Sequence, residues 1–488
     1  MSQHFDVVVV GASLGPLAAA SLLARRGFRV LVLGHHDRPP TYNYEGHVLY
    51  RRVSQFAVFG SRAWARVLGE LAQQQPMRRR LALLDPMFQV LSPGMRLDAW
   101  RDGARFLRVF ERAHPDLGEA VATLYSRLSH LNEATDKLLD DDIIMPPGTF
   151  LERQRAAKWR KLPFAAERSP CAIANVDDGH PFAIQFEAIS RSLGYAWPSS
   201  ALGLARVHAL ATRGPMALPG GDRAWIQFFR ERIEAHGGLV KERGRAHRID
   251  TGRGRVTGLV VDDESRVSCD FVVTSLTAAG AMALAGVAHP SVPSVSMRRF
   301  SMTVMAASEG IPAAIGREVI IIDGTQLMRL EVLREAEGVT LALEMETAVD
   351  EPSKHLRERA MTLLERYLPF VEGHYRIIDS PHDGRPLWDY RSGKKVDIAR
   401  EELLAGGAIS KAEGMPSLFS LPDNSWARLA AEPVRFPLRG LLGVGPSVLP
   451  ALGQEGEVLA AISVARLITQ TDKPRERMRR EMWRKMEV

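Results

Sequence analysis

Cysteine is scarce in this chain, which has only Cys171 and Cys269 among its 488 residues. Two cysteines cannot build a disulfide framework, and their spacing fits no common metal-binding motif, so we expect a reducing compartment. No apolar run approaches the roughly 18 residues that a membrane-spanning helix needs. The amino terminus also lacks the basic and apolar regions of a secretion signal. These absences predict a cytoplasmic protein, soluble or at most attached to a membrane surface.

Positive charge is concentrated at the carboxyl end of the chain. The net charge is +7, and residues 473–488 contain seven basic against three acidic residues, so this tail supplies +4 of it. The rest of the chain shows no basic stretch with interleaved aromatic residues, which argues against a nucleic-acid partner. Within the tail, Met478, Met482 and Met486 recur every four residues beside basic ones. This pattern predicts an amphipathic helix that either touches an anionic membrane or packs its methionines on its own domain.

The first 34 residues read as a strand, a tight turn, a helix and a second strand. Residues 5–10 form a β-branched apolar run, which is typical of a strand buried on both faces. Residues 11–15 make the turn, residues 17–26 are rich in alanine and leucine, and residues 29–33 form the next apolar run. A short helix between two buried strands indicates a right-handed βαβ unit.

The remaining chain changes between helical, α/β and antiparallel-sheet patterns. Helical periodicity dominates residues 61–160, and a second α/β portion follows Pro219, with a helix at 225–236, a two-strand ribbon at 246–261 and a strand at 271–275. Residues 290–430 predict an antiparallel sheet with a helix at 356–367, and a last helix is expected at 455–468. We therefore predict a discontinuous dinucleotide-binding domain of residues 1–60, 215–290 and 435–470. A substrate domain comprises residues 61–214 and 291–434, and residues 471–488 form a tail.

Three segments together resemble a known family. The turn at Gly11 to Gly15 stands where a Gly-x-Gly-x-x-Gly fingerprint holds a dinucleotide. The stretch from Pro219-Gly220-Gly221 to Leu276, and the closing motif from Gly440 to Ala461, are similar to phytoene-desaturase-like and retinol-saturase-like FAD oxidoreductases of the amine-oxidase superfamily. The resemblance implies an α/β chain: a Rossmann-like FAD-binding domain of the glutathione-reductase type, with an inserted α+β substrate domain.

The resemblance also implies a cofactor, a reaction and a set of binding residues. It implies that FAD accepts or donates a hydride while a long apolar substrate, isoprenoid- or carotenoid-like, lies beneath the inserted domain. It names no catalytic residue and no metal site. The residues that it places against FAD are Gly11, Ser13, Leu14, Gly15, Arg38, Val240, Gly445, Gly453 and Gly456.

The sequence departs from the family where FAD would be held. Gly34 stands where an acidic residue normally bonds the adenosine ribose, and Pro39-Pro40 replace a Gly-Gly pair beside the diphosphate. Each lost charged hydrogen bond weakens binding by about 1.5–3 kcal/mol. A second interpretation therefore stays open, in which the chain is a flavin-free, non-catalytic member of the fold that binds a lipid, an isoprenoid or a protein, as Rab escort proteins do.

Pocket-lining residues are less well defined by the sequence. His180, Tyr195, Trp197 and Arg213 lie between the two recognisable blocks and are candidates without an assigned role. The histidines at 35, 36 and 47 show no ligand spacing and are more simply explained as loop residues. Oligomeric state is not predicted.

Overall fold

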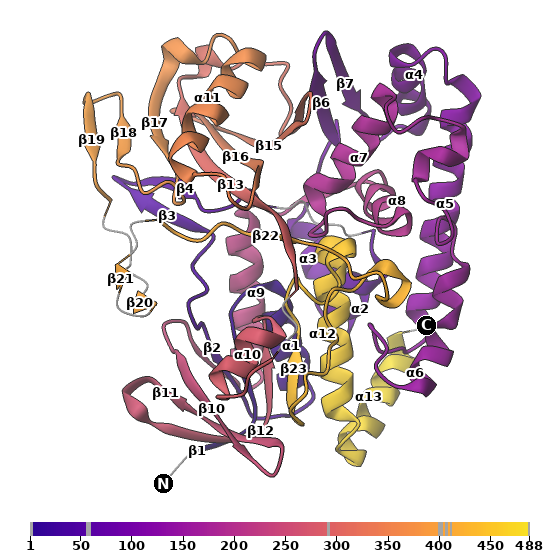
Figure 1. Ribbon diagram of the computed structural model, residues 1–488, viewed down its shortest axis with the longest axis vertical. Helices are drawn as coiled ribbons and strands as arrows, with labels where there is room; N and C mark the ends of the chain where they lie inside the picture. The colour runs from indigo at the N-terminus through magenta and orange to yellow at the C-terminus, as the bar shows by residue number, and fades with distance from the viewer. Residues whose placement is uncertain are drawn as a thin grey trace.

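The computed structural model describes residues 3–54, 60–289, 293–398 and 412–486, together with strand residues 404–405 and 408–409. Two sheets dominate the described chain, one at the bottom and one at the upper left of Figure 1, with a helical layer along the right. Among the described residues, no helix is both long and apolar enough to cross a membrane.

The first sheet is built from segments far apart in the sequence. Its parallel strands run in the order β9, β2, β1, β12, and β23 pairs in parallel with the carboxyl end of β12. At the amino end of β12, β11 pairs with it antiparallel, and β10 pairs with β11. Every residue of β1 from Val7 to Val10 is buried, as a strand covered on both faces requires. The strands span β1 (Gln3–Val10), β2 (Val30–Leu33), β9 (Leu239–Lys241), β10 (Ala246–Gly252), β11 (Arg255–Val261), β12 (Arg266–Thr274) and β23 (Leu441–Gly443).

Helices cover both faces of this sheet. Helix α1 (Leu14–Arg25) packs between α9 (Gly221–Ala235) and α12 (Gly453–Thr469) on one face, and α10 (Ala278–Leu284) lies near β10 on the other. Buried alanines at positions 18, 19 and 20 let α1 approach its neighbours closely. The sequence therefore places the start of α1 at the carboxyl edge of the sheet, beside the start of α12.

The second sheet is larger and almost entirely antiparallel. It runs in the order β19, β18, β17, β13, β16, β15, β14, β6, β7, and β22 pairs with β13. Helix α11 (Leu356–Tyr367) packs its buried leucines on one face. The strands span β6 (Phe88–Ser92), β7 (Met95–Ala99), β13 (Val295–Ala306), β14 (Glu318–Asp323), β15 (Gln326–Glu335), β16 (Gly338–Ala348), β17 (Tyr375–Asp379), β18 (Leu387–Asp389), β19 (Lys394–Val396) and β22 (Ser417–Phe419).

The helical layer is formed mostly by one continuous part of the chain, residues 62–211. Together with α1, α9 and α12 it forms the largest buried apolar cluster. Helix α13 (Lys473–Met486) closes the chain beside α12 and α2. The layer comprises α2 (Arg62–Glu70), α3 (Gln74–Arg80), α4 (Gly103–Ala113), α5 (Gly118–Asp140), α6 (Phe150–Arg155), α7 (Pro181–Leu193) and α8 (Ala201–Ala211).

Two expectations about local structure need correction. Residues 61–160 are mainly helical as predicted, but the hairpin of β6 and β7 within them was not, and it extends the second sheet through a parallel pairing of β6 with β14. Helix α1 begins at Leu14, three residues earlier than predicted, because Pro16 is accommodated in its first turn, where no intrahelical amide is lost.

Candidate functional site

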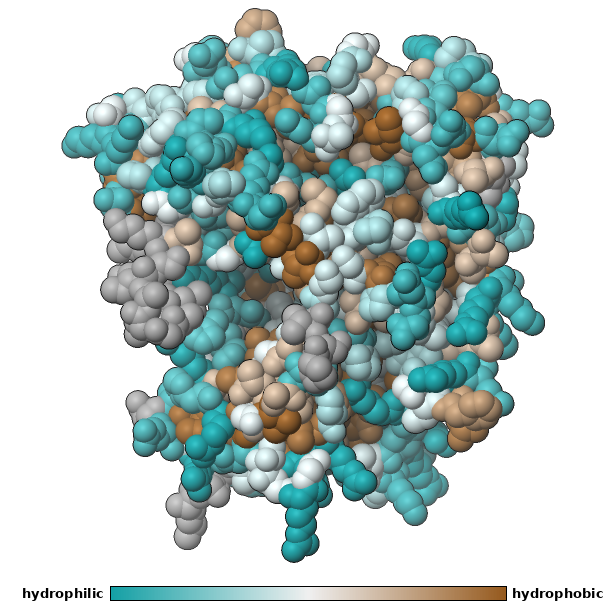
Figure 2. Space-filling view, viewed as in Figure 1, coloured by the Kyte–Doolittle hydropathy of each residue, from teal (hydrophilic) through white to brown (hydrophobic). Residues whose placement is uncertain are grey.

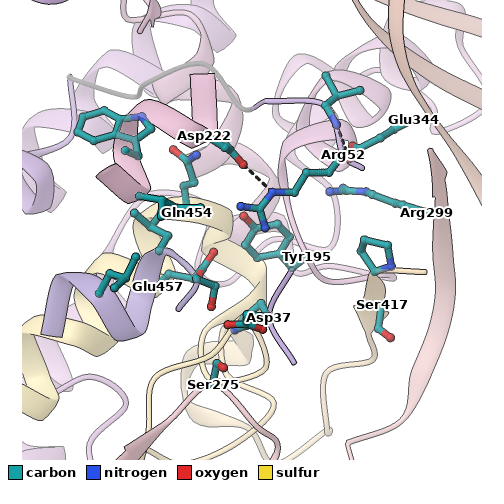
Figure 3. A pocket seen from close by; sticks show the side chains of 18 of the residues that line it. Asp37, Arg52, Tyr195, Asp222, Ser275, Arg299, Glu344, Ser417, Gln454 and Glu457 are labelled. Carbon is teal, nitrogen blue, oxygen red and sulfur yellow. Dashed lines mark hydrogen bonds and ion pairs between the residues drawn. The ribbon is translucent and has the colours of Figure 1, made fainter. Parts of the chain in front are cut away.

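A cavity of about 640 Å³, which we call the chamber, lies where the carboxyl edge of the first sheet meets the second sheet (Figure 3). Leu14 and Leu17 of α1 line it, and so do Trp225, Ile226 and Phe229 of α9, which form an apolar wall. Charged side chains also line the chamber, one from α9 itself and five from other segments of the chain. The charged lining residues are Asp37, Arg52, Asp222, Arg299, Glu344 and Glu457.

The two guanidinium groups of the chamber are already engaged. Arg52 forms an ion pair with Asp222, with 2.7 Å between Nε and Oδ2. Arg299 donates to the backbone carbonyls of Arg191 at 2.7 Å and Gly194 at 2.6 Å. Glu344 accepts a bond of 3.0 Å from the amide of Val53. Four carboxyl groups therefore face two guanidinium groups that are held in place by the protein.

Asp37 bonds the turn that precedes α1. Its Oδ2 accepts a 2.7 Å bond from the amide of Ala12, and it also accepts from the backbone and side chain of Ser13. The carboxyl faces the chamber, but protein encloses it on its other sides. This burial raises the pKa of Asp37, while the amides of Ala12 and Ser13 and the charge of Arg52 act in the opposite direction.

Glu457 reaches the same helix from α12. Its Oε2 accepts a 3.3 Å bond from the amide of Gly15, and the hydroxyl of Tyr195 also donates to it. Burial raises the pKa of Glu457 to about 7, although Arg52 and these two donors oppose the rise. The amides at residues 12, 13 and 15 thus meet carboxyl groups of this chain, and residue 16 is a proline without an amide hydrogen.

Gln454 supplies an acceptor with no donor. It lies in the first turn of α12, only 6% exposed, and lines the chamber. Its Oε1 has no hydrogen-bond partner among the described residues. A buried polar atom without a partner costs about 1–3 kcal/mol, so a ligand N–H at this position would be stabilising.

Comparisons with known proteins agree on the architecture. A family model described as an NAD(P)-binding Rossmann-like domain matches residues 9–71. No curated protein matches the chain. An oxidoreductase from Methanosarcina mazei superimposes with a TM-score of 0.57 at 16% identity, covering 94% of this chain and 99% of its own. The chain therefore has a Rossmann-like α/β fold that is similar to the fold of this protein.

Two amine oxidases have similar structures. A putrescine oxidase variant gives a TM-score of 0.57 at 14% identity, with 97% of this chain and 100% of that chain covered. Cyclohexylamine oxidase from Brevibacterium oxydans gives 0.55 at 14% identity, with 96% and 99% covered. At these identities the likeness establishes the fold and leaves the ligand to be argued from the chamber itself.

The chamber does not fit the dinucleotide half of FAD. A diphosphate needs free amides and positive charge at the start of α1. Here the amides of residues 12, 13 and 15 meet Asp37 and Glu457, and carboxyl groups outnumber guanidinium groups in the lining. Gly34 stands where an acidic residue would bond the adenosine ribose, and a Cβ there would lie 1.8 Å from the carbonyl oxygen of Glu242. No side chain can stand at this position unless residue 242, which directly follows β9, moves.

Replacing Gly34 with alanine should therefore lower the free energy of unfolding by about 1–3 kcal/mol, the usual cost of overpacking. Gly34 directly follows β2 and is held against residues 241 and 242, since its amide bonds the carbonyl of Lys241 at 3.0 Å. Urea denaturation followed by circular dichroism measures the change. Gly103→Ala is the matched control, since a Cβ there meets nothing within 4 Å. Equal stability of the two variants would contradict the close approach.

Seven of the nine residues expected to hold FAD line the chamber or lie beside residues that line it, and their proposed contacts stay predictions. Ser13 and Leu14 line it directly, while Gly11 lies beside Ser275 and Asp37. The other four glycines are packing positions at which a Cβ would lie 2.2–2.4 Å from a backbone carbonyl oxygen: Gly15, Gly445, Gly453 and Gly456.

Other candidates lie elsewhere. The guanidinium of Arg38 contacts Glu413, and Val240 is half-buried in β9, paired with Val32. Of the four candidates without an assigned role, Tyr195 lines the chamber. The others contact Asp116, Asp136 or Arg191 and are absent from its lining: His180, Arg213 and Trp197.

The carboxyl groups that define the chamber were not identified from the sequence. Neither Asp37 nor Glu457 is among the residues that the sequence predicts to hold a ligand, because that prediction rests mainly on the glycines around them. A signal was present, since Gln454, Glu455 and Glu457 are polar residues in an otherwise apolar segment. Polar residues at the start of a buried helix indicate enclosed charge.

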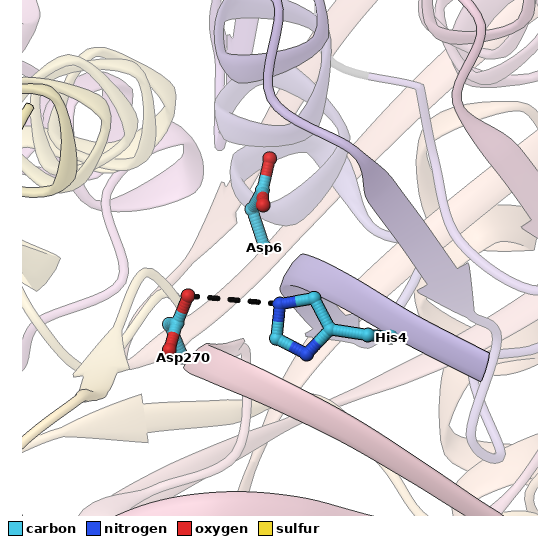
Figure 4. Close-up of side chains that lie close together, drawn as sticks. All are labelled: His4, Asp6 and Asp270. Carbon is cyan, nitrogen blue, oxygen red and sulfur yellow. Dashed lines mark ion pairs between the residues drawn. The ribbon is translucent and has the colours of Figure 1, made fainter. Parts of the chain in front are cut away.

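One group of possible metal ligands lies at the opposite end of β1. His4, Asp6 and Asp270 place ligand atoms within 4.8 Å of one another (Figure 4). Asp6 already accepts the amide of Arg29 at 2.8 Å and pairs with Arg475 at 3.5 Å. These solvent-facing side chains are explained by ion pairing, and we assign no ion to them.

Proposed function

We propose that this chain is a flavin-free member of the oxidoreductase fold and that its chamber binds a small organic cation. The observation that carries the proposal is the contact of Asp37 and Glu457 with the amides at the start of α1. Where a dinucleotide would need those amides, this chain supplies its own carboxyl groups.

The class of ligand follows from the lining. An apolar wall with Trp225 and Phe229 suits a hydrocarbon body and favours a cation near an aromatic face. The excess of carboxyl groups and the unpartnered Oε1 of Gln454 suit an ammonium group that donates hydrogen bonds. Two matched structures are named as oxidases of putrescine and cyclohexylamine, so the fold accommodates amines elsewhere.

Spectroscopy and ligand titration test the proposal. We expect the purified protein to be colourless and to leave the fluorescence of added FAD unchanged. Cyclohexylamine should raise the melting temperature, because a ligand that binds only the folded state stabilises it. Cyclohexanol, which is similar in size but uncharged, is the matched control. Glu344→Gln should reduce the response to the amine, since it removes a chamber charge.

A second candidate is the FAD-dependent oxidoreductase of desaturase or saturase type, with an isoprenoid-like substrate. The apolar wall and the extension of the chamber from α1 to α12 favour it. Under this candidate the purified protein would be yellow or would take up FAD in a saturable way. Either result would overturn the proposal that the chain is flavin-free. An equal response to the amine and the alcohol would overturn the proposal that the chamber binds an organic cation.

A further inference from the structure

Helix α6 presents two large apolar side chains to solvent. Phe150 is 73% exposed and Leu151 is 66% exposed, and of the other exposed large hydrophobic residues described only Phe370 is comparable. Figure 2 shows a tan and brown spot that protrudes at the lower right, where Figure 1 places α6, with hydrophilic atoms around it. The spot is a projection, so it does not form a groove that could receive a helix or a strand.

The projection is held rigidly. Thr149 and Glu152 form a capping box at the start of α6, and Glu152 also pairs with Arg435 through bonds of 2.6 and 2.8 Å. Although burial alone would raise the pKa of Glu152, these partners hold it at about 2. The apolar pair is therefore fixed in its outward position, and little conformational entropy remains to be lost when it is buried.

Unpaired basic residues border the projection. Arg153, Arg155, Arg160 and Lys161 are all exposed, and none forms an ion pair within the part of the chain that the structure describes. Burial lowers the pKa of Arg466, and the nearby charges of Arg479 of α13 and Arg155 of α6 act in the same direction. Helix α6 therefore lies on the same side of the molecule as α13, at the lower right of Figure 1.

Helix α13 extends the same basic surface. Its Arg477 and Arg480 side chains are 86% and 69% exposed, and Met478 between them is 40% exposed. The helix is anchored by Arg479, which is buried and bonds Asp142 and Glu476. Met478 thus lies on the solvent side of α13 while Met482 is half-buried, and the choice between a membrane contact and packing on the chain's own domain stays a prediction.

We propose that α6 and its basic surroundings dock on an anionic lipid bilayer, with Phe150 and Leu151 entering the headgroup region. A rigid apolar projection can enter a soft interface without a complementary pocket. Basic residues near an anionic leaflet add electrostatic attraction to this insertion. An acidic protein would satisfy the arginines but would leave the apolar pair without a partner.

Vesicle co-sedimentation of the full chain tests this proposal. We expect binding to vesicles of phosphatidylcholine mixed with phosphatidylserine, little binding to phosphatidylcholine alone, and weaker binding as salt rises. Phe150→Ser with Leu151→Ser should reduce the affinity roughly a hundredfold, since two apolar side chains are then no longer buried in the headgroup region. Phe370→Ser is the matched apolar control and should bind as the unchanged protein does.

Charge and insertion can be separated. Arg153→Glu with Arg160→Glu should abolish binding, whereas Arg105→Glu with Arg108→Glu on α4 should not. In Leu151→Trp, tryptophan emission should shift to the blue on addition of anionic vesicles. The proposal is overturned if the unchanged protein stays in the supernatant, or if Phe370→Ser weakens binding as much as Phe150→Ser with Leu151→Ser does. It is also overturned if the arginine variants weaken binding but Phe150→Ser with Leu151→Ser does not, because the contact would then be purely electrostatic, as a contact with an acidic protein would be. None of these outcomes depends on the ligand of the chamber.

Discussion

Replacing Glu455 with alanine should lower the free energy of unfolding by about 3–5 kcal/mol, the usual cost of removing one partner of a buried ion pair. Glu455 lies in the first turn of α12 and bonds Arg206 of α8 through distances of 2.7 and 2.8 Å. Each side chain is 1% exposed. Ser61 also donates to Glu455 at 2.6 Å. Without the carboxylate, a guanidinium would be left buried with Asn132 and the more distant Asp136.

Urea denaturation with a double-mutant cycle measures this pair. Glu455→Leu combined with Arg206→Met should lose much less stability than either single variant, because no buried charge is left unpaired. The exposed pair of Arg477 and Glu481 on α13 is the matched control, with 3.6 Å between its charged atoms. Breaking it should change stability by at most about 1 kcal/mol. If Glu455→Ala costs no more than this control, the ion pair does not hold α12 in place.

Local structure was predictable wherever neighbouring residues decide it. The β-branched run before Gly11 predicts β1, and the expected helix at 356–367 matches α11 at both ends. The hairpin of β6 and β7 was missed because its pairing partner, β14, lies more than 200 residues further along the chain. Five-residue strands next to long helical stretches carry too little periodicity to be separated from them.

The candidate site was predictable only in its backbone. Glycines mark places where chain segments approach closely, so Gly11, Gly15 and Gly445 pointed to the region that became the edge of the chamber. The carboxyl groups there come from four distant segments, and sequence shows that each is polar without showing that they converge. Asp37 illustrates this limit: its distance to Ala12 decides whether a diphosphate fits, and no pattern around residue 37 reveals that contact.

Glu457→Gln should stabilise the protein at pH 8 by up to about 3 kcal/mol and leave its stability unchanged near pH 4.5. Burial raises the pKa of Glu457 from its usual 4.5 to about 7. Between these two values the folded chain binds more protons than the unfolded chain, so the free energy of unfolding of the unchanged protein falls as pH rises. The loss amounts to about 1.4 kcal/mol for each pH unit of the shift. Glutamine does not titrate, so the variant escapes this loss.

Denaturation at several pH values gives the difference in free energy of unfolding between Glu457→Gln and the unchanged protein. Glu481→Gln on the exposed side of α13 is the control, and its difference should not change with pH. A difference that grows between pH 4.5 and 7 identifies Glu457 as a buried carboxyl that stays largely protonated in the native chamber. If the glutamine variant were instead less stable at pH 8, Arg52 and Tyr195 would be stabilising an ionised Glu457. The chamber would then carry the full negative charge at neutral pH, and its affinity for an organic cation would change little with pH. With the raised pKa, that affinity should increase as pH rises through 7, because ionisation of Glu457 then adds a charge that attracts the ligand.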